Sequence, residues 1–124
     1  MIDHLSLGTH RYADAVAFYE RVLAPLGMRL QRDNGKEAGF GSDANWCFWL
    51  YPAPADQAPT APGMHVALAA PSRAAVRAVH ELALAAAARD ITSPRLRPDI
   101  TDTYFGAMFH DLDGHRIEIV THAA

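Results

Sequence analysis

The chain has 124 residues, half of them hydrophobic, and a formal net charge of −3. It is long enough to bury a core and too apolar to be disordered, and its slight acidity argues against a nucleic-acid partner. No apolar run approaches the roughly 20 residues that span a bilayer, and no basic, apolar leader precedes the first strand-like segment, so we expect no membrane partner. The one cysteine cannot form an internal disulfide, which favours a cytoplasmic location.

The first half of the chain begins with a strand pattern and continues with a helix pattern. Residues 2–8 alternate, with leucines on one face and His4 and Ser6 on the other, which predicts a strand. Residues 12–26 carry an apolar stripe at helical spacing, and Gly27 is placed to cap the C-terminus of that helix. Clusters of Asp, Asn, Ser and Gly then separate three short predicted strands, near 28–32, 37–41 and 46–51.

The second half repeats this order. Residues 63–69 predict a strand, and Ser72 is a good N-cap for an alanine-rich helix over about 72–88. The stretch 91–103 contains two prolines and is predicted to be irregular. Two strands end the chain, near 104–110 and 115–121, joined by the sequence Asp-Leu-Asp-Gly, whose Asp-Gly pair is a strong hairpin signal.

The two halves match at several positions when one is shifted along the other. A shift of 61 places His4 over His65, and a shift of 69 places residues 48–50 over 117–119, so the second copy holds about eight extra residues. An internal repeat of this kind decides the architecture before local propensity does. We therefore divide the single predicted domain (1–124) into module one (1–51), a proline-rich linker (52–62) and module two (63–124).

Four segments in this order resemble the vicinal oxygen chelate superfamily over nearly the whole chain: IDHLSL, AFYERVLAPLGMRL, MHVALAA and DLDGHRIEIV. That superfamily includes glyoxalase I, extradiol dioxygenases, fosfomycin-resistance enzymes and bleomycin-resistance proteins. The resemblance implies an α+β fold in which two β-α-β-β-β modules form an eight-stranded cup. The helices would lie outside the cup and the active site inside it.

Three metal-binding candidates fall on the inner face of that cup. Strand alternation turns His4 and His65 away from the leucine-rich face, and it turns Glu118 away from Ile117 and Ile119. A single histidine on a strand is more often structural, but two histidines and one carboxylate on a common face suit iron(II) or manganese. The resemblance implies that these three residues are the ligands, with zinc or nickel as alternative ions.

Trp49 stands at the position where glyoxalase I carries a fourth, carboxylate ligand that also transfers protons. An indole can neither bind the metal nor accept the proton, so glyoxalase I activity is not expected. Trp49 instead forms an apolar wall of the substrate pocket or simply fills core. With three protein ligands, about three positions of an octahedral ion stay open for a chelating substrate and oxygen or water.

Three further residues are candidates for contact with substrate. Ser6 lies on the same face of its strand as His4, and Tyr104 begins the strand that leads into the final hairpin turn. Both are therefore catalytic candidates. Arg97 lies in the extra stretch of module two and is a candidate for binding an anionic substrate. The alternatives are a packed aromatic ring for Tyr104 and a solvated side chain for Arg97.

The sequence thus leads to two hypotheses about function. In the first, the protein is a metal-dependent enzyme acting on a small substrate that chelates the ion through neighbouring oxygens. The reaction is that of a dioxygenase, or of a lyase or transferase of the fosfomycin-resistance type. In the second, it sequesters a small molecule without metal, as bleomycin-resistance proteins do. A homodimer is expected because small domains cover open sheet edges, with the cup closed within one chain or between two.

Overall fold

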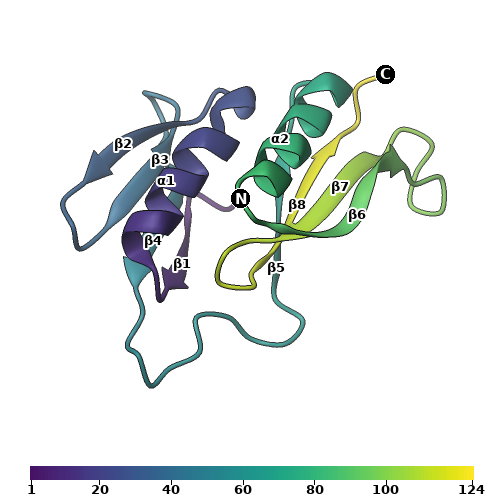
Figure 1. Cartoon of the computed structure of the whole chain (residues 1–124). Helices are drawn as coiled ribbons and strands as arrows, with labels where there is room; N and C mark the ends of the chain where they lie inside the picture. The colour runs from purple at the N-terminus through teal and green to yellow at the C-terminus, as the bar shows by residue number, and fades with distance from the viewer.

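The computed structural model describes residues 1–124 and has the predicted α+β architecture of two repeated modules (Figure 1). Module one contains β1 (Leu5–Thr9), α1 (Tyr12–Val22), the 3-10 helix η1 (Ala24–Leu26), β2 (Arg29–Asp33), β3 (Ala38–Gly41) and β4 (Phe48–Pro52). Module two contains β5 (His65–Ala69), α2 (Arg73–Ala85), β6 (Arg89–Leu96), β7 (Phe105–His110) and β8 (Arg116–Thr121). Neither α-helix is long and apolar enough to cross a membrane.

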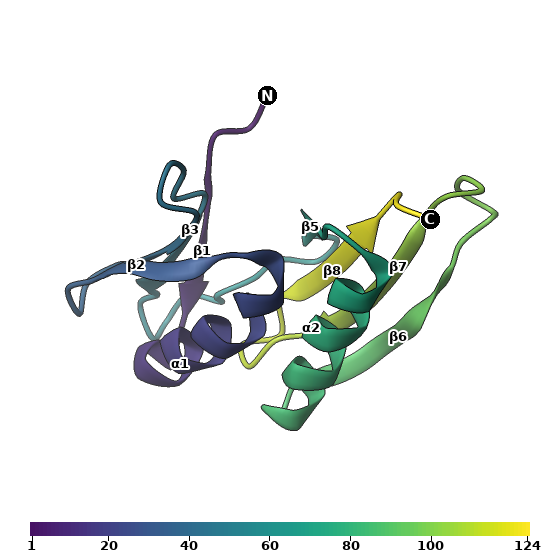
Figure 2. The same cartoon turned by 90° about the horizontal axis from the view of Figure 1, so that it is seen from above.

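Each module forms a four-stranded sheet of the same topology. The strand orders are β1-β4-β3-β2 and β5-β8-β7-β6, with the first pair of each sheet parallel and the others antiparallel. Trp49 pairs with Ser6 in one sheet and Glu118 pairs with Ala67 in the other, which confirms that Trp49 and Glu118 occupy equivalent positions. Both helices lie on one side of the two sheets, and the sheets are not closed into one barrel (Figure 2).

Local sequence signals account for the ends of the helices. The Ser72 hydroxyl accepts a hydrogen bond from the Ala75 amide at 3.1 Å, the N-cap that the sequence predicts for α2. The predicted helix over 12–26 is shorter than expected, because regular α-helix ends at Val22 and the segment holding Pro25 continues as η1. Gly27 then adopts a φ of +74°, the left-handed conformation expected of a C-terminal cap.

The prediction that 91–103 is irregular is wrong for its first half, where β6 extends from Arg89 to Leu96. The strand includes Pro94, which cannot donate a ladder hydrogen bond. β6 tolerates this proline because it is the edge strand of its sheet and its pairing with β7 is interrupted by two register shifts. A proline that argues against a central strand is therefore no evidence against an edge strand.

One hydrophobic cluster of 23 buried residues spans both modules. The helices α1 and α2 contact each other, and Phe18 of α1 packs edge-on against Phe109 of β7 with ring centroids 6.3 Å apart. The modules are thus joined by contact between their helices and by packing of α1 against β7.

The β7–β8 turn, Asp111–His115, adds a polar tie between the modules. Tyr19 of α1, almost fully buried, donates its hydroxyl proton to Asp111. Thr9 of β1 donates to Asp113 at 2.5 Å, and the His115 ring nitrogen Nε2 lies 2.7 Å from the carbonyl oxygen of Gly8. These bonds fix the end of β1 against module two.

Candidate metal centre

Two of the three predicted metal ligands meet in module two. His65 is the first residue of β5, and Glu118 lies on the neighbouring β8 with only 7% of its surface exposed. His65 Nε2 and Glu118 Oε2 are 3.4 Å apart. Ligand atoms bonded at about 2.1 Å and at right angles to one ion lie roughly 3 Å apart. The spacing and the chemistry of this pair fit a shared divalent ion.

Tyr104 supports the same carboxylate. Its hydroxyl donates to Glu118 Oε1 at 2.5 Å, so the two carboxylate oxygens face different partners. Burial, together with this hydrogen bond, raises the pKa of Tyr104 to about 12. The phenol is therefore a neutral donor at ordinary pH.

Arg97 approaches Glu118 from the β6–β7 loop. Its guanidinium makes a bidentate ion pair with Asp99, and this hydrogen bonding raises the pKa of Arg97 and lowers that of Asp99. Arg97 and Glu118 line one small hollow together with Thr92 and Gly106. Arg97 thus borders the Glu118 carboxylate, although Asp99 already neutralises the charge of the guanidinium.

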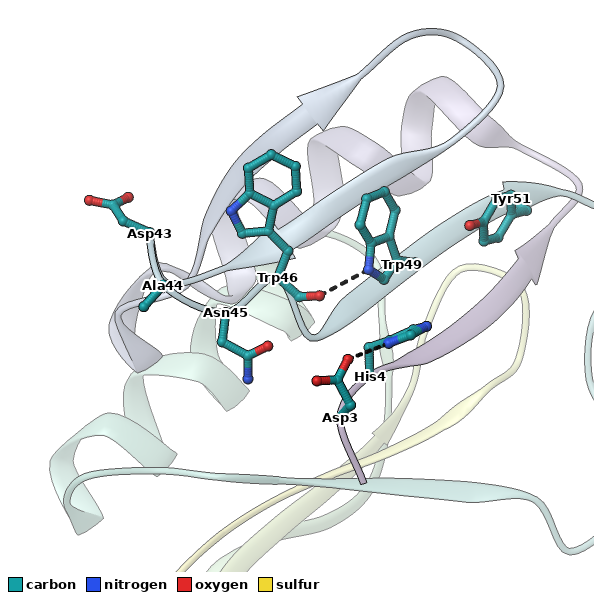
Figure 3. Close-up of a pocket in the computed structure, with 8 residues that line it drawn as sticks. All are labelled: Asp3, His4, Asp43, Ala44, Asn45, Trp46, Trp49 and Tyr51. Carbon is teal, nitrogen blue, oxygen red and sulfur yellow. Dashed lines mark hydrogen bonds and ion pairs between the residues drawn. The ribbon is translucent and has the colours of Figure 1, made fainter. Parts of the chain in front are cut away.

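His4 lies in a different hollow, on module one (Figure 3). It precedes β1, is largely exposed, and has its Nδ1 atom 2.6 Å from the Asp3 carboxylate. The hollow is open, with a volume of about 480 Å³, and Trp46, Trp49 and Tyr51 form its aromatic wall. The pKa of Tyr51 is raised, chiefly by the neighbouring Glu37 carboxylate.

Trp49 is held firmly in this wall. Its indole N–H donates to the Trp46 carbonyl at 2.9 Å, and the two indole rings lie 6.2 Å apart. The ring covers Gly39 of the adjacent strand so closely that a β-carbon there would come within 2.8 Å of it. Arg32 lies 5.8 Å above the Trp46 ring. Sequence reasoning singled out Trp49 but missed Trp46, for which the available signal was a second tryptophan at the start of the same predicted strand (46–51).

The candidate site is therefore divided between the two sheets of one chain. The structure brings His65, Glu118 and Tyr104 together, and it places His4 and Trp49 in the separate hollow of module one. Ser6 is exposed on β1, directly opposite Trp49 on β4. No three His, Cys, Asp or Glu side chains of the chain gather closely enough to hold a metal ion.

The model of one family, the Glyoxalase/Bleomycin resistance protein/Dioxygenase superfamily, matches residues 1–119. The chain belongs to this superfamily. A comparison with curated proteins finds no match. Among solved structures, the chain is similar to a glyoxalase/bleomycin resistance protein from Albidiferax ferrireducens T118, with 22% identity and a TM-score of 0.85 over 96% of this chain and 97% of that one.

Two further solved structures share the fold. One is the genomically encoded fosfomycin resistance protein FosX from Listeria monocytogenes, with 19% identity and a TM-score of 0.70 over 98% of this chain and 92% of that chain. The other is a V278E mutant of glyoxalase I from Zea mays, with 21% identity and a TM-score of 0.69 over 96% of this chain and 45% of that chain. At these identities the likeness concerns the fold, and the chemistry has to be argued from the residues of this chain.

Proposed function

We propose that this protein is a divalent-metal-dependent enzyme whose small substrate chelates the ion through two neighbouring oxygens. His65 and Glu118 hold the ion, and His4 completes the set. The observation that carries the proposal is the 3.4 Å approach of His65 Nε2 to a carboxylate oxygen of Glu118, whose other oxygen is already occupied by Tyr104. Iron(II) or manganese suits this donor set best, and when bound would act as a Lewis acid toward the chelating oxygens.

A second copy of the chain supplies the missing ligand in this proposal. Within one chain the module-one hollow and the module-two ligand pair are separate, yet each carries part of a single donor set. β1 and β5 are edge strands of their sheets, and edge strands readily become interfaces. A two-fold homodimer would place His4 of each chain against His65 and Glu118 of the other, and would form two equivalent centres.

The remaining residues divide the work of binding the substrate. Trp46 and Trp49 provide a rigid aromatic wall for its apolar part, because the indole of Trp49 is fixed by its own hydrogen bond. In this proposal Ser6, which pairs with Trp49 across the sheet, hydrogen-bonds a substrate oxygen, and Arg97, which lines one hollow with Glu118, attracts an anionic group. These roles suit a dioxygenase, or a lyase or transferase of the fosfomycin-resistance type.

The second candidate function is sequestration of a small molecule without metal. The feature that favours it is the open aromatic hollow of about 480 Å³, which needs no ion to bind an apolar ligand. The buried, hydrogen-bonded Glu118 favours the enzyme, because a pure binder gains nothing from a desolvated carboxylate beside a histidine.

Metal analysis separates the two functions. Protein is purified without added metal, incubated with iron(II) or manganese and desalted, and we then expect about one divalent ion per chain. Light scattering should give a mass twice that of the chain. Glu118→Gln should lose the ion, whereas Asp56→Asn, in the exposed linker, should keep it. A metal-free wild-type protein whose tryptophan fluorescence still responds to aromatic ligands would favour sequestration, since both tryptophans of the chain line the hollow.

A glyoxalase assay tests the consequence of having Trp49 where glyoxalase I has a carboxylate. The wild-type protein should not isomerise the hemithioacetal of methylglyoxal and glutathione, because the missing general base alone is typically worth about 10²–10⁴-fold. Efficient turnover with nickel or zinc would show that another group takes the place of that carboxylate.

A further inference from the structure

The extra residues of module two lengthen one hairpin beside Glu118. In module one, β2 has five residues and a short turn leads to β3, whereas in module two β6 has eight residues. The backbone amide of Arg97 donates to the Tyr104 carbonyl at 2.8 Å and closes the longer loop. The position equivalent to Tyr104 under the 69-residue shift is Gly35, in the β2–β3 turn. Module one therefore has no counterpart of this phenol.

The lengthened hairpin brings the Tyr104 ring over Gly106 to reach Glu118. A β-carbon at Gly106 would lie 3.3 Å from both Glu118 Oε1 and Cε1 of the tyrosine ring, so the glycine leaves the room that the phenol needs. On another side, His122 packs edge-on against the ring at 5.4 Å and is itself 3.2 Å from the Thr103 hydroxyl. The phenol is thus fixed by neighbours that touch neither His65 nor the free carboxylate oxygen.

We propose that Tyr104 is a positioning residue that makes Glu118 a one-oxygen metal ligand. This inference rests on the proposed function, since it concerns the ligand set of the same centre. By occupying Oε1, the tyrosine leaves Oε2 alone to face His65. One-oxygen binding keeps a coordination position open that a two-oxygen carboxylate would fill, and a chelating substrate needs two such positions. The sequence predicts Tyr104 as a catalytic residue, and the role proposed here is instead the support of a metal ligand.

The test compares two tyrosines that each donate to a carboxylate. Tyr104→Phe removes the hydroxyl beside Glu118, and Tyr12→Phe removes a similar bond, 2.8 Å long, to Asp33 in module one. Both variants are loaded with cobalt(II), and the affinity is measured by competition with a chelator while the visible spectrum reports the coordination. Supporting residues of metal ligands typically contribute about 10–100-fold in affinity. We expect that loss and an altered spectrum for Tyr104→Phe, and neither for Tyr12→Phe.

The outcomes distinguish this inference from the proposed function. If wild type binds cobalt(II) and Tyr104→Phe binds it equally well with the same spectrum, the positioning role is overturned and the metal centre stands. If wild type binds no cobalt(II), iron(II) or manganese, both fall. If Tyr104→Phe does not fold, a crystal structure of the cobalt-loaded wild type decides. Glu118 bound through one oxygen, with Tyr104 on the other, supports the role, and both oxygens on the ion contradict it.

Discussion

The two modules share topology and register but carry opposite chemistry at one equivalent position. In module one, the inner side of β4 carries Trp49, which covers Gly39 on the next strand. In module two, the same position of β8 carries Glu118, with Met108 opposite. An indole needs the space of a glycine beside it, whereas a carboxylate needs hydrogen-bond partners. The repeated fold fixes where a side chain points, and the individual residue then decides what that position does.

The surroundings of Trp49 and Glu118 also differ, apolar in module one and polar in module two. The hollow of module one is open and aromatic, with His4 at its edge. In module two the Glu118 carboxylate is buried, and Tyr104 and His65 each contact one of its oxygens. Module one thus offers an aromatic surface for a substrate, and module two offers candidate metal ligands. The comparison favours a site assembled from unlike halves, one from each type of module.

Removal of a ligand should have the largest effect. His65→Ala and Glu118→Gln should each weaken divalent-metal binding by more than about 100-fold, beyond the range of a supporting residue. The fold should survive in His65→Ala, because that side chain is half-exposed. Calorimetric titration with manganese, together with circular dichroism, checks both statements. His10→Ala, which removes an exposed histidine from the loop after β1, is the matched control and should bind normally.

The tie between the modules should be the next most sensitive feature. Asp111→Ala leaves the buried Tyr19 hydroxyl and the His115 amide without their acceptor. Each orphaned buried group typically costs about 1–3 kcal/mol, so the free energy of unfolding should fall by roughly 3 kcal/mol in urea titrations. Asp56→Ala in the exposed linker should change it by less than about 0.5 kcal/mol. Equal stability of the two variants would mean that the modules do not depend on this carboxylate.

Two glycine substitutions, one in each module, should affect tryptophan emission and metal affinity separately. Gly39→Ala places a β-carbon 2.8 Å from the Trp49 ring, so it should shift tryptophan emission and leave metal affinity unchanged. Gly106→Ala places a β-carbon 3.3 Å from Glu118 Oε1. It should leave tryptophan emission unchanged and lower the metal affinity by roughly 10–100-fold, the range typical of a supporting contact. The same effect of both variants on both readouts would contradict the division into halves.

The tyrosines should give the smallest effect, at alkaline pH. Burial, followed by contact with a carboxylate, raises the pKa of Tyr12 and Tyr104 to about 12, and burial raises the pKa of Tyr19 well above its usual value. Because a raised pKa favours the neutral phenol in the folded state, this contribution to stability is complete below about pH 10 and declines as the pH approaches 12. Phenolate absorbance should therefore develop at higher pH in folded protein than in urea. Coincident titration curves would contradict these environments.

Much of the fold could be predicted from the sequence because its signals are local or repeated. The repeat of His4 and His65 predicted two modules, and Ser72 predicted the start of α2. Alternation predicted that Ile117 and Ile119 are buried, and both are fully so. The prediction for β6 was wrong because the position of a strand within its sheet, which decides whether Pro94 is tolerated, is a tertiary property.

The site was predicted less completely, for a physical reason. Alternation tells which face a side chain occupies, so it could place His65 and Glu118 together, but the direction in which one sheet meets another does not follow from it. The contact of Tyr104 with Glu118 depends on the length of a hairpin, and the wall formed by Trp46 depends on a turn. The convergence of His4 with the other two candidate ligands, His65 and Glu118, stays a prediction.

Complementation between two inactive variants tests that convergence most directly. His4→Ala and Glu118→Gln chains are each expected to bind no metal as homodimers, and they are unfolded together and refolded as a mixture. If each centre takes His4 from one chain and Glu118 from the other, half of the dimers are mixed and each has one intact centre. The mixture should then recover about one quarter of the wild-type metal content. No recovery, with mixed dimers demonstrated by mass spectrometry, would contradict a centre shared between two chains.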